Sequence, residues 1–140
     1  MNHLRPIMLV DDNEMDVDLT LRAFKNAKLT NPIVVARDGE EALAWVPRWE
    51  AGEPTPVVIL LDINMPKVDG LEVVRQLKVH PVLKVIPVVM LTSSSVSPDV
   101  KAAYLYGANS YIVKPVDFNK FSEVATQIEL YWAVLNTRVD

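Results

Sequence analysis

The apolar residues of this 140-residue chain gather in short runs that alternate with stretches of helical periodicity. Five runs are rich in β-branched and aliphatic residues and are bounded by polar or turn-forming residues. They lie at residues 7–10, 33–36, 57–61, 86–91 and 110–113. Three of them are continuously apolar, which is typical of strands that are covered on both faces in a parallel sheet. The runs therefore predict five strands of a buried parallel sheet.

Between these runs, apolar residues recur with the three- to four-residue spacing of amphipathic helices. The sets that share a helix face are Val17, Leu21 and Phe24; Leu71, Val74 and Leu77; and Val100, Ala103, Tyr104 and Gly107. Asn13, Asp38 and Asp99 lie at or near the expected helix starts, where a short polar side chain can cap the helix. Residues 47–56 (PRWEAGEPTP) are the one segment with the composition of a loop. The order of elements is thus a strand followed by a helix, repeated five times.

Such alternation predicts right-handed crossover connections and a single doubly wound α/β domain. Its sheet has five parallel strands with helices on both faces. The expected strand order is 2-1-3-4-5, the flavodoxin- and CheY-like arrangement.

The last helical stripe is the longest in the chain. It comprises Phe118, Phe121, Ala125, Ile128, Trp132 and Leu135. The spacing predicts one extended C-terminal helix from about Asp117 to Asn136, ~30 Å long at 1.5 Å per residue, whereas a strand spans only ~17–20 Å. The final turns should therefore project beyond the sheet and expose an apolar surface that includes Tyr131, Trp132 and Leu135. We expect this surface to bind a second copy in a two-fold homodimer; the alternative is that it folds back on its own domain.

Composition excludes several kinds of site. The chain has no cysteine, which removes disulfides, zinc–thiolate and iron–sulfur sites and suits a reducing compartment. Its net charge of −4 argues against nucleic acid as the main partner. The apolar runs are far shorter than the ~20 residues of a membrane span, and the first one leads directly into Asp11 and Asp12 rather than a signal cleavage site. We therefore expect a cytoplasmic protein with no membrane partner.

Polar side chains follow four of the five expected strands, at the points where the strands end. They are Asp11 and Asp12, Asp62 and Asn64, Thr92, and Lys114. Each alone could be a helix cap or a solvated charge. Because the carboxyl ends of parallel strands meet at one edge of the sheet, the fold should bring all of them together.

Three clustered carboxylates repel one another unless some are protonated or a cation lies among them. A site of hard oxygen ligands without histidine or cysteine suits Mg²⁺ or Mn²⁺. The lysine and the threonine hydroxyl suit the oxygens of a small anion. The combination predicts a site where a carboxylate becomes phosphorylated with the assistance of a metal ion.

Four motifs carry a specific resemblance. They are V-D-D-N at 10–13, L-L-D-I-N-M-P-K-V-D-G at 60–70, P-V-V-M-L-T-S at 87–93 and G-A-N-S-Y-I-V-K-P at 107–115. In this order and spacing, they make the chain resemble the receiver domain of two-component response regulators, the CheY-like family. The resemblance implies a single receiver domain over 1–140, with a core at about 5–130 and a C-terminal helix extension to 136–140.

The resemblance also implies roles for individual residues. Asp62 matches the phosphoacceptor. The metal ligands it implies are Asp11, Asp12, Asp62 and the backbone carbonyl of Asn64. Thr92 matches the switch hydroxyl, Tyr111 the rotating switch aromatic, and Lys114 the ion-pairing lysine. The Lys114–Pro115 bond is expected to be cis, although only ~5–6% of such bonds are.

The activity implied is phosphoryl transfer to Asp62 from a histidine kinase or a small acyl phosphate. The domain would catalyse its own phosphorylation and dephosphorylation, rather than act as an enzyme on an external substrate. Phosphorylation would change the face formed by the fourth helix, the fifth strand and the fifth helix. The C-terminal stripe, the I-E-x-Y-W stretch at 128–132 and the 47–56 segment are similar to the regulators paired with bacterial phytochromes. This similarity implies a red-light-responsive histidine kinase as phosphodonor.

Three other classes remain open at this point. A haloacid-dehalogenase-type phosphatase would have D-x-D after the first strand and a cap domain, whereas this chain has Asp11, Asp12 and Asn13 there. A flavodoxin-like FMN module needs an anion-accepting loop at the place of that acidic pair. A phosphorylation-independent docking module would not need the full set of site residues.

Overall fold

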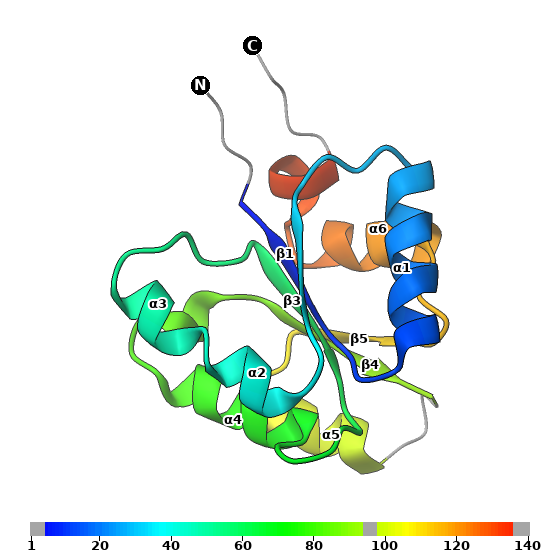
Figure 1. The fold of residues 1–140 in the computed structure, drawn as a ribbon. Coiled ribbons are helices and arrows are strands. Elements are labelled where there is room, and N and C mark those ends of the chain that lie inside the picture. Colours follow the sequence, from blue (N-terminus) through cyan, green and yellow to red (C-terminus); the bar gives the residue numbers. More distant parts are fainter. Residues whose placement is uncertain (1–4, 94–97, 136–140) are drawn as a thin grey trace.

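The structure is a computed structural model that describes residues 5–93 and 98–135 (Figure 1). In chain order the elements are β1 (Ile7–Val10), α1 (Glu14–Asn26), β2 (Ile33–Ala36), α2 (Gly39–Leu43), α3 (Val46–Glu50), β3 (Val58–Asp62), α4 (Gly70–Val79), β4 (Val88–Thr92), α5 (Pro98–Leu105), β5 (Ser110–Val113) and α6 (Phe118–Gln127). A 3₁₀ turn at Leu83–Val85 precedes β4, and a π-helical turn at Tyr131–Leu135 follows α6. Each of the five expected strands is present to within one or two residues.

The five strands form one parallel sheet in the order β2-β1-β3-β4-β5, which confirms the expected topology. Helices α1 and α6 cover one face of this sheet, and α2 to α5 lie on the other (Figure 1). The register pairs Asp62 with Leu91 and Thr92 with Val113, so β3, β4 and β5 end near one another. The structure therefore brings the carboxyl ends of these strands to one edge of the sheet.

The core consists of two apolar clusters, one on each face of the sheet. Alternate strand residues point to opposite faces, so Met8 and Val10 pack with α2, α4 and α5, while Ile7 and Leu9 pack with α1 and α6. On the α1–α6 side, the rings of Phe24 and Phe121 lie 4.8 Å apart between centroids. Burial on both faces explains why the strands appear in the sequence as continuous apolar runs.

Short polar side chains begin four of the helices. Asn13 and Asp38, expected as caps, accept backbone N–H bonds at the starts of α1 and α2. Asp69 and Asp117 do the same for α4 and α6. Asp99 lies in the first turn of α5. None of the helices in the described ranges has the length and apolar character needed to cross a membrane.

The 47–56 segment differs from expectation, because its first residues are helical. Helix α3 covers Val46–Glu50, and Pro47 lies in its first turn, where the missing proline N–H would have had no partner within the helix. Trp49 is buried in the core and stacks on Trp45 at a centroid distance of 6.2 Å. Burial of Trp49 therefore packs the first part of this segment, which is helical, against the core.

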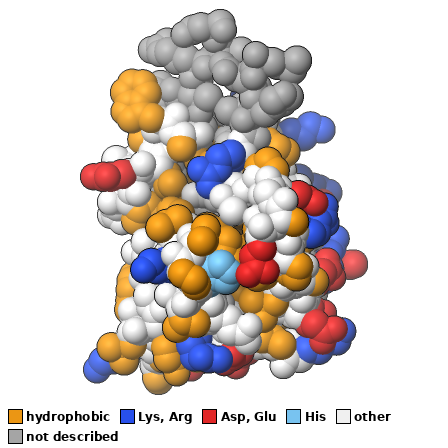
Figure 2. All heavy atoms as spheres, turned by 90° about the vertical axis from the view of Figure 1, so that its left-hand side faces the viewer, with side chains coloured by type: hydrophobic (Ala, Val, Ile, Leu, Met, Phe, Trp, Pro, Cys, Tyr) orange, Lys and Arg blue, Asp and Glu red, His pale blue; other side chains and the backbone are white. Residues whose placement is uncertain are grey.

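Figure 2 shows one face of the molecule, where a histidine lies among hydrophobic side chains beside an acidic one. His80, the residue that follows α4, joins two elements through its side chain. Its Nδ1 accepts the backbone N–H groups of Val82 and Leu83, and its Nε2–H donates to Glu50 at 2.9 Å. The side chain thus joins the end of α3 to the turn after α4. This histidine has a structural role at the end of the sheet opposite the strand ends described above.

The expected continuous C-terminal helix is wrong. Helix α6 ends at Gln127, and Glu129 adopts a left-handed backbone with φ of 62°. The N–H of Leu130 donates to the carbonyl of Ala125 at 2.7 Å, and that of Glu129 donates to Thr126 at 3.3 Å. These two bonds form a Schellman motif, which ends the helix and reverses the chain. Of the predicted helix, Asn136 and the extension to 140 lie outside the described residues.

After this break the chain folds back on its own domain. Leu130 and Val134 are buried in the α1–α6 core cluster, whereas Trp132 is 67% exposed and Tyr131 is 42% exposed. Leu135 is half-buried and lines a cavity of about 250 Å³ against the connection between α1 and β2. The physical reason is burial: the break lets Leu130 and Val134 reach the core, which a straight helix would have carried past it.

Replacement of Glu129 by glycine should raise the free energy of unfolding by about 0.5–1 kcal/mol, because glycine adopts positive φ without steric cost. In a continuous helix the same change would lower stability by about 1 kcal/mol. Urea denaturation distinguishes the two signs. Gln127→Gly, within α6, is the matched control and should destabilise.

Candidate functional site

A cleft of about 380 Å³ opens at the carboxyl edge of the sheet. Its lining residues are Asp12, Asn13, Asp16, Asp62, Asn64, Ser93 and Lys114. They come from β1, β3, β4, β5 and the first turn of α1. The fold therefore brings the predicted residues Asp12, Asp62, Asn64 and Lys114 together, whereas β4 contributes Ser93 to the cleft lining rather than the predicted Thr92.

Local structure fixes the two buried carboxylates. Asp11 follows β1, and its Oδ1 accepts the N–H of Asn13 at 3.0 Å. Asp62 ends β3, and its Oδ1 accepts the N–H of Asn64 at 3.2 Å. Gly70 allows the chain to pass close behind Asp62, since a Cβ there would lie 2.2 Å from the Asp62 carbonyl oxygen. Both aspartates are thus held by turns rather than by flexible loops.

Carboxylate oxygens of Asp11, Asp12 and Asp62 lie within 4.8 Å of one another. Asp11 and Asp62 are 1% and 6% exposed, while Asp12 is open to solvent. The donor set is made of hard oxygens and has one open side, which fits a divalent cation that retains several of its waters. Asn64, the fourth expected ligand, lines the same cleft.

Lys114 enters this cluster from the end of β5. Its Nζ lies 3.0 Å from Asp11 Oδ2, 3.0 Å from Asp16 Oδ2 and 3.1 Å from Asp62 Oδ2. Its backbone N–H donates to the carbonyl of Thr92 at 2.8 Å, which fixes the root of the side chain. The Lys114–Pro115 peptide bond is cis, as expected.

The pKa values of both Asp62 and Lys114 are raised above the ordinary values of these groups. Burial raises the pKa of Asp62 to about 6 against the opposing charge of Lys114, and the neighbouring charge of Asp11 adds to the rise. Burial also disfavours the Lys114 ammonium, but the hydrogen bonds that it donates to Asp11 and Asp16 outweigh this cost and raise the lysine pKa. Lys114 therefore stays charged, while burial holds the pKa of Asp62 well above its ordinary value despite the nearby ammonium group.

The two expected switch residues occupy different positions. Thr92 ends β4 beside Asp62 on the neighbouring strand and is buried, 4% exposed. Tyr111 is half-buried and lines a second cleft of about 380 Å³ between β5 and α6. Its ring meets the edge of Tyr104 at 6.2 Å. Thr92 thus lies at the end of the strand next to Asp62, whereas the ring of Tyr111 lies at the cleft between β5 and α6.

Sequence reasoning missed Asp16. This residue lies in α1, three positions after the cap Asn13, and its carboxylate is as close to Lys114 as that of Asp11. Acidic residues are common in the first turn of a helix, where they favour the helix dipole, so the position carried an ordinary explanation. Its spacing could have revealed it: Asp16 follows Asp12 by four residues, about one helical turn, in the helix that begins just after the acidic pair.

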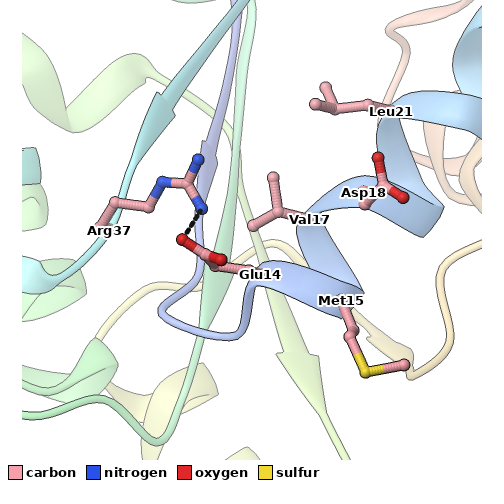
Figure 3. Close-up of a pocket in the computed structure, with 6 residues that line it drawn as sticks. All are labelled: Glu14, Met15, Val17, Asp18, Leu21 and Arg37. Atoms are coloured by element: carbon pink, nitrogen blue, oxygen red, sulfur yellow. Dashed lines mark ion pairs between the residues drawn. The ribbon is translucent and has the colours of Figure 1, made fainter.

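A separate groove of about 430 Å³ runs along α1 (Figure 3). The side chains of Glu14 and Arg37 point toward each other across its end, 4.0 Å apart. Met15 and Leu21 contribute apolar surface from successive turns of the helix. None of the residues lining this groove belongs to the predicted site.

The comparisons with known proteins agree with this geometry. The sequence matches the response regulator receiver domain family over residues 7–126. The chain therefore belongs to this family of phosphoacceptor domains in two-component signalling. A similar structure, that of response regulator Rcp1, is a Mn²⁺-bound form; it is 35% identical to this chain, with a TM-score of 0.72. The family match therefore favours the receiver domain over the phosphatase and flavin-binding classes that the sequence left open.

The chain is similar to several named response regulators along most of its length. The structure is similar to that of the bacteriophytochrome response regulator AtBRR, with 45% identity, a TM-score of 0.85, and coverage of 97% of this chain and 100% of that chain. Response regulator Rcp1 of Synechocystis is 36% identical, over 94% of this chain and 90% of its own. The probable methanogenesis regulatory protein FilR2 of Methanothrix harundinacea is 40% identical over 90% of this chain and 82% of its own.

Without divalent cations, Asp62→Asn should stabilise the protein at neutral pH. The folded-state pKa of about 6 lies above the ordinary 3.8, so ionised Asp62 destabilises the fold, and this cost grows as the pH rises from about 4 to 6. Two pKa units correspond to about 3 kcal/mol, and loss of the Lys114 hydrogen bond leaves an expected gain of about 1–2 kcal/mol.

Urea unfolding in a chelator at neutral pH and near pH 4 measures this effect. The gain should be largest at neutral pH and should shrink strongly near pH 4, where Asp62 is protonated in the folded state and about half protonated in the unfolded state. Equal or lower stability of the variant at neutral pH would contradict the assignment of a destabilising charge to Asp62.

Proposed function

We propose that Asp62 is the phosphoacceptor of this receiver domain. The observation that carries the proposal is the Asp62 carboxylate itself, which lies at the cleft with two further carboxylates within 4.8 Å and the Lys114 ammonium at 3.1 Å. A nucleophilic carboxylate beside a fixed cation suits attack on a phosphoryl group.

The reaction transfers a phosphoryl group without net redox change. A carboxylate oxygen of Asp62 forms a bond to phosphorus, and the bond from phosphorus to a histidine imidazole nitrogen or to an acetate oxygen breaks. The leaving group keeps the electron pair of that bond, and an imidazole leaving group takes a proton from solvent. Lys114 faces the negative charge that builds up on the phosphoryl oxygens.

The residues that would hold Mg²⁺ or Mn²⁺ are Asp11, Asp12, Asp62 and the carbonyl of Asn64. Such an ion, when bound, supplies positive charge that neutralises phosphoryl oxygens. The exposed carboxylate of Asp12 and the buried one of Asp11 suit this role, since the first admits the ion and the second is fixed by its turn.

The chain reads out phosphorylation through Thr92 and Tyr111. Thr92 lies at the end of β4 beside Asp62, within reach of the edge where a phosphoryl group would stand. Tyr111 borders a cleft on the β5–α6 side that can accept a change of its ring position. Hydrolysis of the acyl phosphate reverses the change, so the domain catalyses its own transfer and release and is not an enzyme acting on an external substrate.

The phosphodonor is a sensor histidine kinase in the cytoplasm, and we infer that it is a bacterial phytochrome. The similarity to regulators named for bacteriophytochromes, at 45% and 46% identity over nearly the whole chain, supports this pairing. The phosphorylated regulator RcpA of a cyanobacterial phytochrome, 36% identical, supports it further.

We also infer self-association through the C-terminal turn. The break after α6 buries Leu130 and Val134 but leaves Tyr131 and Trp132 exposed, with their rings edge to face at 5.8 Å. Two adjacent aromatic rings suit an interface with a second copy. The surface is smaller than the straight helix would have provided, and half-buried Leu135 contributes less to it.

Asp62→Asn should abolish phosphate incorporation in the presence of Mg²⁺, because the amide cannot act as the nucleophile. The donors are radiolabelled acetyl phosphate and an autophosphorylated bacterial phytochrome kinase. Asp18→Asn, which removes an exposed carboxylate from α1, should label normally and is the matched control. Retained labelling of the Asp62 variant would overturn the phosphoacceptor assignment, and no labelling of the unmodified chain would support a phosphorylation-independent docking role.

Trp132→Ala should weaken self-association about tenfold or more, in line with the loss of a central interface aromatic. Sedimentation equilibrium measures the change. Val79→Ala, at a similarly exposed apolar residue at the end of α4, should leave the association constant unchanged. If Trp132→Ala sediments as the unmodified chain does, the dimer surface lies elsewhere.

A further inference from the structure

Lys114 has a carboxylate partner, Asp16, that was not among the predicted site residues. An ammonium group has three N–H donors, and Lys114 has three carboxylate oxygens within 3.0–3.1 Å. Two of them belong to Asp11 and Asp62. The third belongs to Asp16, which comes from α1 and lies outside the group of three carboxylates that can share a cation. The lysine donors are therefore fully used before any phosphoryl group arrives.

The side chain of Asp16 is not needed to begin its helix. The backbone N–H of Asp16 donates to Asn13 Oδ1, and its backbone carbonyl accepts the hydroxyl of Thr20. Both bonds survive replacement of the carboxylate. The side chain is 30% exposed, points to the cleft and accepts a hydrogen bond from Lys114 at 3.0 Å. Its carboxylate thus belongs to the site rather than to the helix cap.

Phosphorylation changes what Lys114 must neutralise. Asp62 passes from a single negative charge to an acyl phosphate with up to about two, and the new oxygens need donors. Lys114 can serve them only by giving up or sharing a bond that it already makes. The partly exposed Asp16 holds one of the Lys114 donors, and its negative charge would repel a phosphoryl group bound to the same ammonium. The loss of a Lys114 donor and the charge repulsion both disfavour the phosphorylated state.

Resting on the phosphoacceptor function of Asp62, we propose that Asp16 is a positioning residue that competes with the phosphoryl group for the Lys114 ammonium. It holds Lys114 in the unphosphorylated arrangement and thereby weakens the phosphorylated state. A residue of α1 therefore contributes to the equilibrium between the unphosphorylated and phosphorylated arrangements of the site.

The test compares the affinity of chain variants for beryllofluoride, a tetrahedral anion that stands in for a phosphoryl group on a carboxylate. Asp16→Asn should bind it about five- to tenfold more tightly than the unmodified chain at saturating Mg²⁺, as measured by calorimetry or fluorine NMR. Asp16→Glu keeps the charge and should stay within about twofold of the unmodified chain. Asp18→Asn removes the same charge from α1 at a residue paired with Arg22, and should have no effect.

The direction of the change separates competition from a structural role. A side chain that merely supports the site would weaken binding when replaced, whereas a competitor strengthens it. Equal or weaker binding by Asp16→Asn overturns the proposal, as does an equal gain in Asp18→Asn, which would indicate a general charge effect. If the unmodified chain itself neither binds the anion nor accepts phosphate, the phosphoacceptor function fails, and that result is distinct from both.

Discussion

One ammonium group holds the acidic edge of this sheet together. Lys114 forms ion pairs with carboxylates that come from β1, α1 and β3, at 3.0–3.1 Å, and its own backbone is bonded to the end of β4. Without that charge, Asp11 and Asp62 would lie buried beside each other and repel. The turns after β1 and β3 fix the two buried aspartates, and the lysine from the last strand supplies the positive charge that lets them lie close together.

The same cluster contains a carboxylate whose ionised form is disfavoured by burial. Burial raises the pKa of Asp62 to about 6 despite the opposing charge of Lys114, and the charge of Asp11 adds to the rise. The ionised carboxylate of Asp62 therefore destabilises the folded chain. The same three carboxylates form a set of hard oxygen donors that suits a divalent cation. One arrangement thus combines a cost to the fold with a donor set suited to a metal ion.

The sequence allowed the sheet and most of its edge to be predicted, because continuous apolar runs and parallel topology leave few alternatives. It did not reveal Asp16, since an acid in a first helical turn has an ordinary explanation. It also led to a wrong C-terminal helix. The three- and four-residue spacing continues through Ile128 and Trp132, yet the left-handed residue Glu129 shifts burial to Leu130 and Val134. Periodicity records which residues are apolar, but not where a backbone reverses.

The edge is joined to α6 by a short series of direct bonds. The N–H of Lys114 donates to Thr92, and Lys120 of α6 donates through its Nζ to the carbonyls of Val113 and Pro115 at 3.2 and 3.4 Å. The end of β5 is thus bonded both to the strand end at the acidic edge and to α6. Because α6 leads into the turn that carries Trp132, direct bonds and chain continuity connect the acidic edge with the exposed aromatic surface.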